Sequence, residues 1–554
     1  MKKKISILIV FVFAIAFLFR FYNILWGSPY FFHPDERNIA YATERIRFPN
    51  QLNPQFFAYG SFPIYVIYFT GVCFNFFSHF LNIEKNISDI FSVSFENAIF
   101  FGRFYSAVFS FISIFLTVKI YKKISNKTPG TILLMWLLTT SAGFIQFAHF
   151  ATFEMWLTFF TLLQFYYLLK FFEQKKVVYF SISSVIFGLL LSIKISSLTL
   201  FPISLFIIKK TKLNWKKNLV IFLVTAFVTG ILTSPFYVLD FSTFKSNITY
   251  ESNVATETLP VFYSGQFFYT IPILFQLTKV YPFLINPMLT ILFIPSLLYV
   301  TIIGFKKTKN SYLLLLFTYL LLFLPQSFLF VKWTRYMVPT LPFIYLIITI
   351  FLSELLQGLQ KKVHYYYISI IVIITITISI GFAFSYFLTV YLNPDTRIQA
   401  SSWASEHIPK NAKILSEVYD LGIIPFNQYF QNIQLFNFYY LDNTDTSDGG
   451  RLSLRSHDSS EVNDLEQKLR DSDYLILPSQ RILKNRITNK QKFPVGFKFY
   501  YKLLSGKLGY KKIYETPCDI FCKIIYMGDP VFNIEETANV FDRPMVFIFK
   551  HEKL

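Results

Sequence analysis

The stretch His33-Pro34-Asp35-Glu36-Arg37 places two adjacent carboxylates shortly after the first apolar segment of the chain, Ser6–Tyr22. That segment follows an N-terminal lysine triplet and is long enough to cross a bilayer, which takes roughly 17 to 25 residues. An acidic pair at the mouth of a membrane span is costly to place and is hard to explain as packing. We therefore expect a membrane protein in which this acidic pair has a function.

The composition indicates a membrane protein with many spans. The chain has 554 residues, 54% of them hydrophobic, and a mean hydropathy of +0.45. Soluble domains seldom reach such values, and apolar runs of spanning length recur along the chain. The net charge of +20 would suit a nucleic-acid partner. The lysines, however, lie in short clusters between apolar runs, as the positive-inside rule predicts, so we exclude nucleic acid and expect membrane lipids as the surroundings.

The lysine positions also decide the topology. If Phe62–Phe80 crossed the membrane, Lys122, Lys123 and Lys127 would lie on the outer face, against the positive-inside rule. We therefore place Phe62–Phe80 along the outer interface, in a first outer loop of residues 23–97 with juxtamembrane helices. The N-terminus is then cytoplasmic. About eleven spans are expected, at Ser6–Tyr22, Ala98–Tyr121, Thr131–Phe147, Phe153–Phe172, Val177–Ile193, Ile195–Ile208, Leu219–Pro235, Phe283–Phe305, Tyr312–Phe330, Met337–Leu352 and Ser369–Tyr391.

After an odd number of spans, the polar C-terminal part lies outside the cytoplasm. The composition changes at Asn393-Pro394, and short strand-like runs then alternate with helical patterns. We predict a membrane domain over residues 1–392 and an extracytoplasmic α/β domain over residues 393–554. The strand-like runs are Lys413–Val418, Tyr474–Leu477, Lys523–Met527 and Met545–Phe549.

The two cysteines of the tail, Cys518 and Cys522, leave their redox state open. On one strand they would lie about 13 Å apart, too far for a disulfide, so a bridge requires a turn between them. Two free thiols are an equal alternative.

Polar groups gather at the outer ends of the expected spans. Basic residues are found there against the general rule, which suggests that they have an anionic partner. Each residue also has a plainer explanation, since acids cap helices, long basic side chains snorkel, and a histidine can be satisfied at the interface. Their joint position on one face favours a site for an anionic lipid headgroup. The set consists of His33, Asp35, Glu36, His149, Glu154, Lys194, Lys332, Arg335 and Tyr336.

Four segments carry a resemblance to a known family: His33-Pro34-Asp35-Glu36, Gly102–Ala107, His149–Glu154 and Arg335–Pro342. They resemble motifs of the GT-C fold membrane glycosyltransferases of the protein O-mannosyltransferase and aminoarabinose-transferase type (glycosyltransferase family 39). The resemblance covers about Ser6–Tyr391. The chain departs from the pattern at Glu154, where an Asp is usual, and at Lys194, which is followed by Ile-Ser rather than Gly-Pro.

The resemblance implies a polytopic, inverting enzyme of the GT-C fold. Such an enzyme moves a sugar from a polyprenyl-phosphate donor to a hydroxyl acceptor, here on the outer face of the prokaryotic cytoplasmic membrane. A hydroxyl needs a base to take its proton, and the departing lipid phosphate needs a cation. We therefore expect Asp35 as the base and Glu36 as a residue that positions the acceptor or a cation. The other expected roles are donor-phosphate binding by Arg335, Lys194 and Lys332, and completion of the acceptor or metal site by His149, Glu154, His33 and Tyr336.

A divalent cation is an optional part of this hypothesis. Asp35 and Glu154 offer the carboxylate oxygens that Mg²⁺ or Mn²⁺ prefers, although the sequence does not require a metal.

Other functions remain open at this point. A polytopic transporter or lipid flippase would instead place charges deep within its spans and repeat its span pattern. An oligosaccharide ligase of related fold would differ in the size of its donor, and a non-catalytic subunit would be expected to lose the acidic pair. The sequence does not disclose the sugar or the acceptor.

Overall fold

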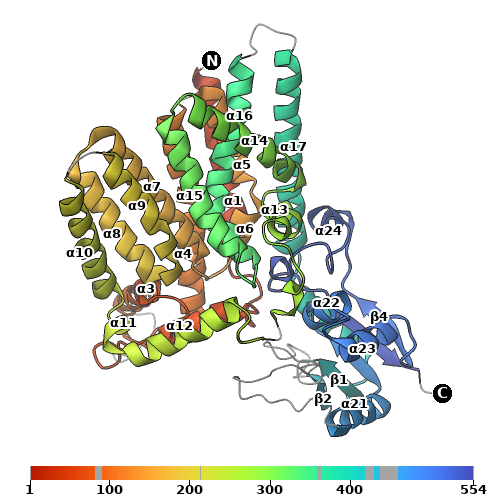
Figure 1. Cartoon of the computed structure of the whole chain (residues 1–554). Coiled ribbons are helices and arrows are strands. Elements are labelled where there is room, and N and C mark those ends of the chain that lie inside the picture. The colour runs from red at the N-terminus through yellow and green to blue at the C-terminus, as the bar shows by residue number, and fades with distance from the viewer. Residues whose placement is uncertain are drawn as a thin grey trace.

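The computed structural model describes residues 2–81, 90–125, 127–211, 214–261, 263–358, 364–417, 429–436 and 459–552. Figure 1 shows a bundle of long helices beside a smaller part that contains a sheet. Among the described residues, eight helices are long and apolar enough to cross a membrane, or nine when the bent pair α5–α6 counts as one span. The bundle contains α1 (Lys2–Phe21), α4 (Phe95–Ile124), α5 (Thr128–Thr139), α6 (Ala142–Ala148), α7 (Glu154–Gln174), α8 (Val177–Ile193), η2 (Ile195–Leu200), α9 (Phe201–Lys210), α10 (Trp215–Thr233), α14 (Pro287–Lys306), α15 (Asn310–Ser327), η5 (Thr334–Thr340), α16 (Leu341–Gly358) and α17 (His364–Val390).

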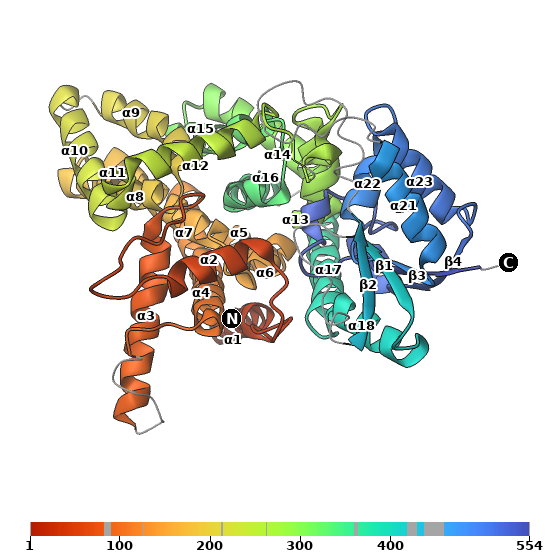
Figure 2. The same cartoon turned by 90° about the horizontal axis from the view of Figure 1, so that it is seen from below.

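One of the eight apolar helices, α3 (Ser61–Phe80), does not run with the others. It is seen from its end in Figure 1 and along its length in Figure 2, so it lies across one end of the bundle. This is the orientation expected for a helix in the first outer loop. Without α3, a count of about eleven spans includes the shorter α1 and α8 and the broken η2–α9 segment. The remaining short elements are α2 (Pro34–Glu44), α11 (Phe236–Leu239), α12 (Phe241–Ala255), η3 (Gly265–Phe267), η4 (Gln276–Val280) and α13 (Tyr281–Leu284).

The bend of 50° between α5 and α6 is held by a buried arginine of the first helix. Arg20 is fully buried and donates hydrogen bonds to the carbonyls of Leu138 (2.8 Å) and Thr139 (3.3 Å), at the end of α5. It also donates to the hydroxyl of Ser110 (2.9 Å). The C-terminal carbonyls of a helix lack partners within the helix and attract positive charge. Arg20 thus stabilises the break after which α6 starts, with Ser141 as its N-cap.

The end of the bundle opposite α3 carries the lysine clusters, and ion pairs join several helices there. Glu354 of α16 pairs with Lys127, just before α5 (3.6 Å), and with Lys309, just before α15 (3.3 Å). Lys123 at the end of α4 pairs with Glu173 at the end of α7. These contacts bring lysines of different loops to one end of the bundle.

The tail forms a five-stranded sheet of order β2-β1-β3-β5-β4. β1 (Lys413–Glu417) pairs in parallel with β2 (Asn432–Phe436) and with β3 (Tyr474–Leu477), for example Leu415 opposite Leu475. β5 (Phe547–His551) runs antiparallel to β3 and to β4 (Tyr510–Glu515). The predicted α/β character of the tail is confirmed. Its helices are α18 (Thr396–His407), α21 (Ser459–Asp471), α22 (Arg481–Thr488), α23 (Pro494–Leu504), α24 (Ile520–Ile525) and η6 (Glu536–Ala538).

One predicted strand is wrong. Lys523–Met527 was expected as a strand, but this region contains helix α24 and the turn that follows it. Asp519 caps the helix by accepting a hydrogen bond from the backbone N–H of Cys522 (2.9 Å). Such a cap satisfies an N–H that a short apolar run alone would leave without a partner. The apolar face of α24 then packs against α17, so a helical rather than an extended segment buries these residues.

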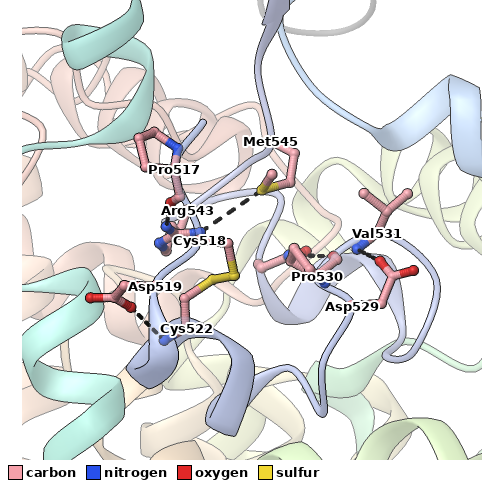
Figure 3. The surroundings of a disulfide bond; sticks show 10 residues. Pro517, Cys518, Asp519, Cys522, Asp529, Pro530, Val531, Arg543 and Met545 are labelled. Atoms are coloured by element: carbon pink, nitrogen blue, oxygen red, sulfur yellow. Dashed lines mark hydrogen bonds between the residues drawn. A yellow bond between two sulfur atoms is a disulfide. The ribbon is translucent and has the colours of Figure 1, made fainter. Parts of the chain in front are cut away.

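The same turn joins the two tail cysteines. Cys518 and Cys522 form a disulfide with a Cα–Cα distance of 5.2 Å, which the turn into α24 makes possible (Figure 3). Beside it, Arg543 donates a hydrogen bond to the carbonyl of Pro517. Cys522 and Tyr526 are buried in the same apolar core as the membrane helices. The tail therefore contributes side chains to the core of the bundle as well as forming its own sheet.

Candidate active site

The structure brings Asp35 and Arg335 together across 300 positions of sequence. Asp35 lies in the first turn of α2, which has Pro34 at its first position and His33 as its N-cap. The ring Nδ1 of His33 accepts a hydrogen bond from the backbone N–H of Asp35 (3.2 Å). The carboxylate of Asp35 forms an ion pair with the guanidinium of Arg335 in η5, and the two side chains remain 24% and 21% exposed. An ion pair with this exposure is accessible to a ligand.

The charges around Asp35 keep the pKa of its carboxyl below its usual value. Burial is the largest single influence and would raise this pKa, but Arg335, His33 and Lys194 together outweigh burial and lower it. Asp35 is therefore ionised at neutral pH. Burial lowers the pKa of His33 to about 4, so its ring is neutral and able to accept the hydrogen bond from Asp35.

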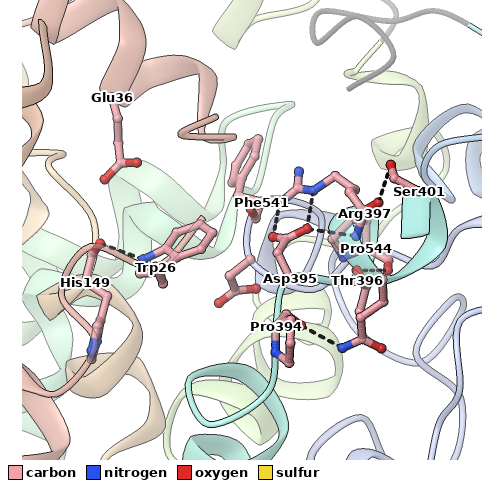
Figure 4. Close-up of polar contacts among 12 residues, drawn as sticks. Trp26, Glu36, His149, Pro394, Asp395, Thr396, Arg397, Ser401, Phe541 and Pro544 are labelled. Carbon is pink, nitrogen blue, oxygen red and sulfur yellow. Dashed lines mark hydrogen bonds and ion pairs between the residues drawn. The ribbon is translucent and has the colours of Figure 1, made fainter. Parts of the chain in front are cut away.

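Glu36, the second acid of the pair, has entirely different surroundings. Its carboxylate is fully buried and binds Arg103 of α4 through both oxygens, at 2.8 and 2.7 Å. It also accepts a hydrogen bond from the backbone N–H of Ala151. Arg103 in turn donates to the carbonyl of Trp26 (2.8 Å), whose indole donates to the carbonyl of His149 (3.1 Å; Figure 4). Glu36 thus joins α2 to the bundle, and its oxygens are already occupied.

A small polar pocket with a free volume of about 50 Å³ opens beside the Asp35–Arg335 pair. Four elements, α7, η2, α15 and η5, surround it. Lys194 and Arg335 supply positive charge, and the ammonium group of Lys194 lies over the rings of Tyr59 (5.2 Å) and Tyr336 (5.0 Å). Hydroxyl and amide groups lie next to leucines in the wall. The lining consists of Glu154, Leu157, Thr161, Lys194, Ser196, Ser197, Thr199, Leu200, Leu322, Gln326, Arg335, Tyr336 and Pro339.

Two buried polar groups of this pocket lack partners among the described residues. Both carboxylate oxygens of Glu154, which is 2% exposed at the start of α7, accept no hydrogen bond from these residues. The Nε of Arg335 likewise donates none to them. Buried polar atoms are nearly always hydrogen-bonded, because leaving one without a partner costs about 1–3 kcal/mol or more. Unsatisfied donors and acceptors in one pocket suit a polar ligand.

The residues of the site do not form a metal centre. The described part of the chain contains no group of three His, Cys, Asp or Glu side chains that could hold an ion. Asp35 and Glu154, the two candidate ligands, are instead accompanied by the cations Arg335 and Lys194. Because two positive side chains stand where a divalent cation would have to enter, the residues present do not fit Mg²⁺ or Mn²⁺.

Two of the expected site residues lie away from the pocket. Lys332 is 3% exposed, donates to the carbonyl of Phe330 (2.8 Å) and does not line the pocket. Both ring nitrogens of His149 contact backbone carbonyls, of Ile145 (2.8 Å) and Tyr22 (2.9 Å), and its ring stacks on Tyr391. These positions do not support phosphate binding by Lys332 or a place for His149 in an acceptor or metal site.

Other residues near the site carry no local sequence signal. Glu251 of α12 interacts electrostatically with Arg335, Lys194 and Asp35, and burial raises the pKa of its carboxyl. Arg481, at the start of α22 in the tail, also lowers the pKa of Asp35. Both come from segments far from the site in sequence, so only the fold reveals them.

Comparisons with solved structures show similarity over nearly the whole chain. The oligosaccharyltransferase AglB from Archaeoglobus fulgidus, in complex with an inhibitory peptide and a dolichol-phosphate, matches with a TM-score of 0.50 and 11% identity, over 99% of this chain and 88% of that chain. The same enzyme tethered to an acceptor peptide with an NVT sequon matches with a TM-score of 0.50 and 12% identity, over the same shares. ArnT from Cupriavidus metallidurans bound to undecaprenyl phosphate matches over 89% of this chain and 95% of that chain, with 12% identity and a TM-score of 0.43.

Residues 87–239 match the family model of the dolichyl-phosphate-mannose-protein mannosyltransferases. The structural matches show that the chain shares the fold of AglB. Residues 87–239 contain Arg103, Glu154 and Lys194, and thus part of the pocket and the arginine that holds Glu36. The resemblance read from the sequence and the expected fold are confirmed for this chain. No curated protein sequence matches it.

Proposed function

We propose that this chain is a GT-C glycosyltransferase that moves a sugar from a polyprenyl-phosphate donor to a hydroxyl acceptor, with inversion at the anomeric carbon. The observation that carries the proposal is a pocket beside the ionised Asp35. In this pocket Lys194 and Arg335 meet Glu154, whose carboxylate accepts no hydrogen bond from the described residues. One face of the bundle thus offers cations for a phosphate, an acceptor of hydrogen bonds for a sugar and a carboxylate for a proton.

The donor phosphate binds between Arg335 and Lys194. Arg335 has its Nε unused by the described residues while another nitrogen holds Asp35, so it can donate to a phosphate oxygen without leaving the carboxylate. Lys194 lies across the same pocket, and the hydroxyls of Ser196 and Thr199 line it. Leucines in the wall suit the first apolar part of a lipid.

Asp35 acts as the general base. As the acceptor oxygen forms its bond to the anomeric carbon, its proton passes to the Asp35 carboxylate, and the bond from that carbon to the phosphate oxygen breaks. The charge that develops on the leaving phosphate is met by Arg335 and Lys194. A bound phosphate also shares the guanidinium that holds the pKa of Asp35 down, so donor binding makes the carboxylate a stronger base.

The remaining site residues position the reactants. The two oxygens of Glu154 accept hydrogen bonds from hydroxyls of the donor sugar, which removes the cost of leaving them unsatisfied. Tyr336 holds the ammonium group of Lys194, and His33 caps the helix that presents Asp35. Glu36 acts through Arg103 as a positioning residue. No step requires a metal ion.

We further propose the orientation of the enzyme in a prokaryotic cytoplasmic membrane. The lysine-rich end of the bundle faces the cytoplasm, and the pocket and the tail face outward. The Cys518–Cys522 disulfide supports this orientation, since such bonds persist in oxidising compartments outside the cytoplasm. Residues 1–392 then form the membrane domain with the catalytic site, and residues 393–554 form the outer domain.

The test is sugar transfer by the purified full chain in liposomes, with labelled polyprenyl-phosphate sugars and product analysis. Asp35→Asn should lower the transfer rate by about 10²–10⁴-fold, the usual contribution of a general base. Asp240→Asn, which removes another carboxylate between α11 and α12, serves as the matched control and should transfer normally. A near-normal rate for Asp35→Asn would remove Asp35 from the role of base. Activity only with lipid-diphosphate oligosaccharides would instead identify an oligosaccharide ligase.

A further inference from the structure

A short segment of the tail, Glu535–Phe541, contacts both halves of the proposed site. At one end the carboxylate of Glu535, which is fully buried, accepts two hydrogen bonds from Thr334. They come from the backbone N–H (2.9 Å) and the hydroxyl (2.8 Å), and join residues 201 positions apart. Thr334 is the first residue of η5 and directly precedes Arg335.

Glu535 does for η5 what a local capping residue does for most helices. The residue before the helix, Trp333, provides no side-chain cap. The first N–H groups of a helix lack partners within it, and a carboxylate placed there is stabilised by the helix dipole. Because η5 continues into α16, this contact sets where a long apolar helix begins, and with it the position of Arg335.

At its other end the segment contacts the helix that carries Asp35. The ring of Phe541 stacks on the imidazole of His33 at a centroid distance of 4.1 Å, and His33 is the N-cap of α2. The carbonyl of Phe541 accepts a hydrogen bond from Arg397 (2.6 Å), which places the ring where the tail begins (Figure 4). One stretch of seven residues in the tail therefore contacts the supports of both the proposed base and the proposed phosphate ligand.

We propose that Glu535 is a positioning residue, through which the tail sets Arg335 against Asp35 for donor binding. This inference rests on the proposed function. The tail is then part of the donor site, in addition to any contact it makes with the acceptor. The other oxygen of Glu535 accepts a hydrogen bond from Gln266 (2.5 Å), and the charge of Lys484 lies nearby. With both oxygens engaged, a glutamine at this position would replace an acceptor by a donor and lose part of the cap.

The first measurement is amide hydrogen exchange of the full chain in detergent, which needs no substrate. Glu535→Ala and Glu535→Gln should speed exchange over residues 334–338 by about tenfold or more, since the Thr334 N–H loses its acceptor. Glu417→Gln is the matched control. Glu417 is another buried glutamate of the tail, hydrogen-bonded by Tyr500, and its replacement should leave exchange in η5 unchanged.

The second measurement is binding of a sugar-free polyprenyl phosphate. Both Glu535 variants should weaken it about tenfold, whereas Glu417→Gln should not. Thr334→Val, which keeps the N–H but loses the hydroxyl, should weaken binding less, and adding it to Glu535→Ala should bring no further loss. That non-additivity separates positioning through Thr334 from general destabilisation.

Three results would overturn the inference: unchanged exchange in η5, unchanged lipid-phosphate affinity, or additive effects of the two substitutions. If the wild-type chain binds the lipid but transfers no sugar, the proposed function fails, while exchange and binding still decide the role of Glu535.

Discussion

The two ends of the helix bundle use charge in opposite ways. At the lysine-rich end, Glu354 pairs with Lys127 and Lys309 at 3.6 and 3.3 Å, and these side chains are 15–37% exposed. At the other end, Glu36 and Arg103 form a pair that is 0% exposed, and Glu154 is buried without a hydrogen-bond partner among the described residues. The partly exposed pairs at the lysine-rich end anchor loops at a membrane surface and cost little folding free energy. Burying charges such as those at the other end costs folding free energy, and this difference between the two ends indicates where the site lies.

The largest expected effect comes from breaking the buried pair. Glu36→Gln leaves the guanidinium of Arg103 without its carboxylate in a fully buried position, which should cost about 3–5 kcal/mol of folding free energy. Thermal unfolding of the purified protein in detergent should show it, together with a lower yield of folded chain. Normal stability would mean that Glu36 is not a structural residue, and its catalytic role would then have to be reconsidered.

Removal of the charge at Arg335 should have the next largest effect. Arg335→Gln should weaken binding of a polyprenyl phosphate by about 10–100-fold, the range expected for a charge-assisted hydrogen bond of 1.5–3 kcal/mol. Lys332→Gln is the control, because Lys332 does not line the pocket. This variant should bind the lipid with the affinity of the wild type. Equal losses in the two variants would argue for a general effect of surface charge.

The pH dependence should show how Arg335 acts on Asp35. Transfer requires ionised Asp35, which exists above the pKa of its carboxyl, so activity falls as the pH drops through that pKa. Burial would raise this pKa, but Arg335, the strongest of the groups that lower it, and the other charges nearby together bring it below the usual value. Activity should therefore persist to a lower pH than an ordinary aspartate would allow. In Arg335→Gln the acid limb of the kcat profile, measured at saturating donor, should move to higher pH. An unchanged limb would mean that Arg335 does not set the pKa of Asp35.

The smallest effect is expected at the other end of the bundle. Glu354→Gln removes an ion-pair partner of Lys127 and Lys309 where the side chains are partly exposed, so the loss should be about 1 kcal/mol or less. Unfolding temperature and transfer rate should both stay close to those of the wild type. A large loss of transfer would show that the two ends are more strongly coupled than their exposure suggests.

Much of the site could be predicted from the sequence, because its members are polar residues at the ends of apolar spans. Asp35, Glu154, Lys194, Arg335 and Tyr336 all lie at or beside the pocket. The adjacency of Asp35 and Glu36 in the sequence does not imply that their side chains share one environment. Neighbouring residues of a helix point in different directions, so the two acids of one motif have different partners.

The contributions of distant segments could not be predicted. Lys332 is close to Arg335 in sequence, yet the loop before η5 directs it to the carbonyl of Phe330. Glu535 meets Thr334 only because the tail returns to the membrane bundle, a contact without local periodicity. The predicted strand at Lys523–Met527 failed for the same reason, since packing against α17 favours a helix there.

The buried Arg20 has a consequence for how the protein is assembled in the membrane. Besides the carbonyl of Ala16 in its own helix, its guanidinium binds the carbonyls of Leu138 and Thr139, which are synthesised 118 and 119 residues later. During synthesis the guanidinium therefore lacks two of the acceptors that it has in the folded protein, and the hydrocarbon core of the membrane offers none in their place. We expect this helix to wait near the membrane surface or beside the insertion machinery until α5 arrives. Its final placement then comes as a late step of membrane assembly, when the bend between α5 and α6 closes around the guanidinium.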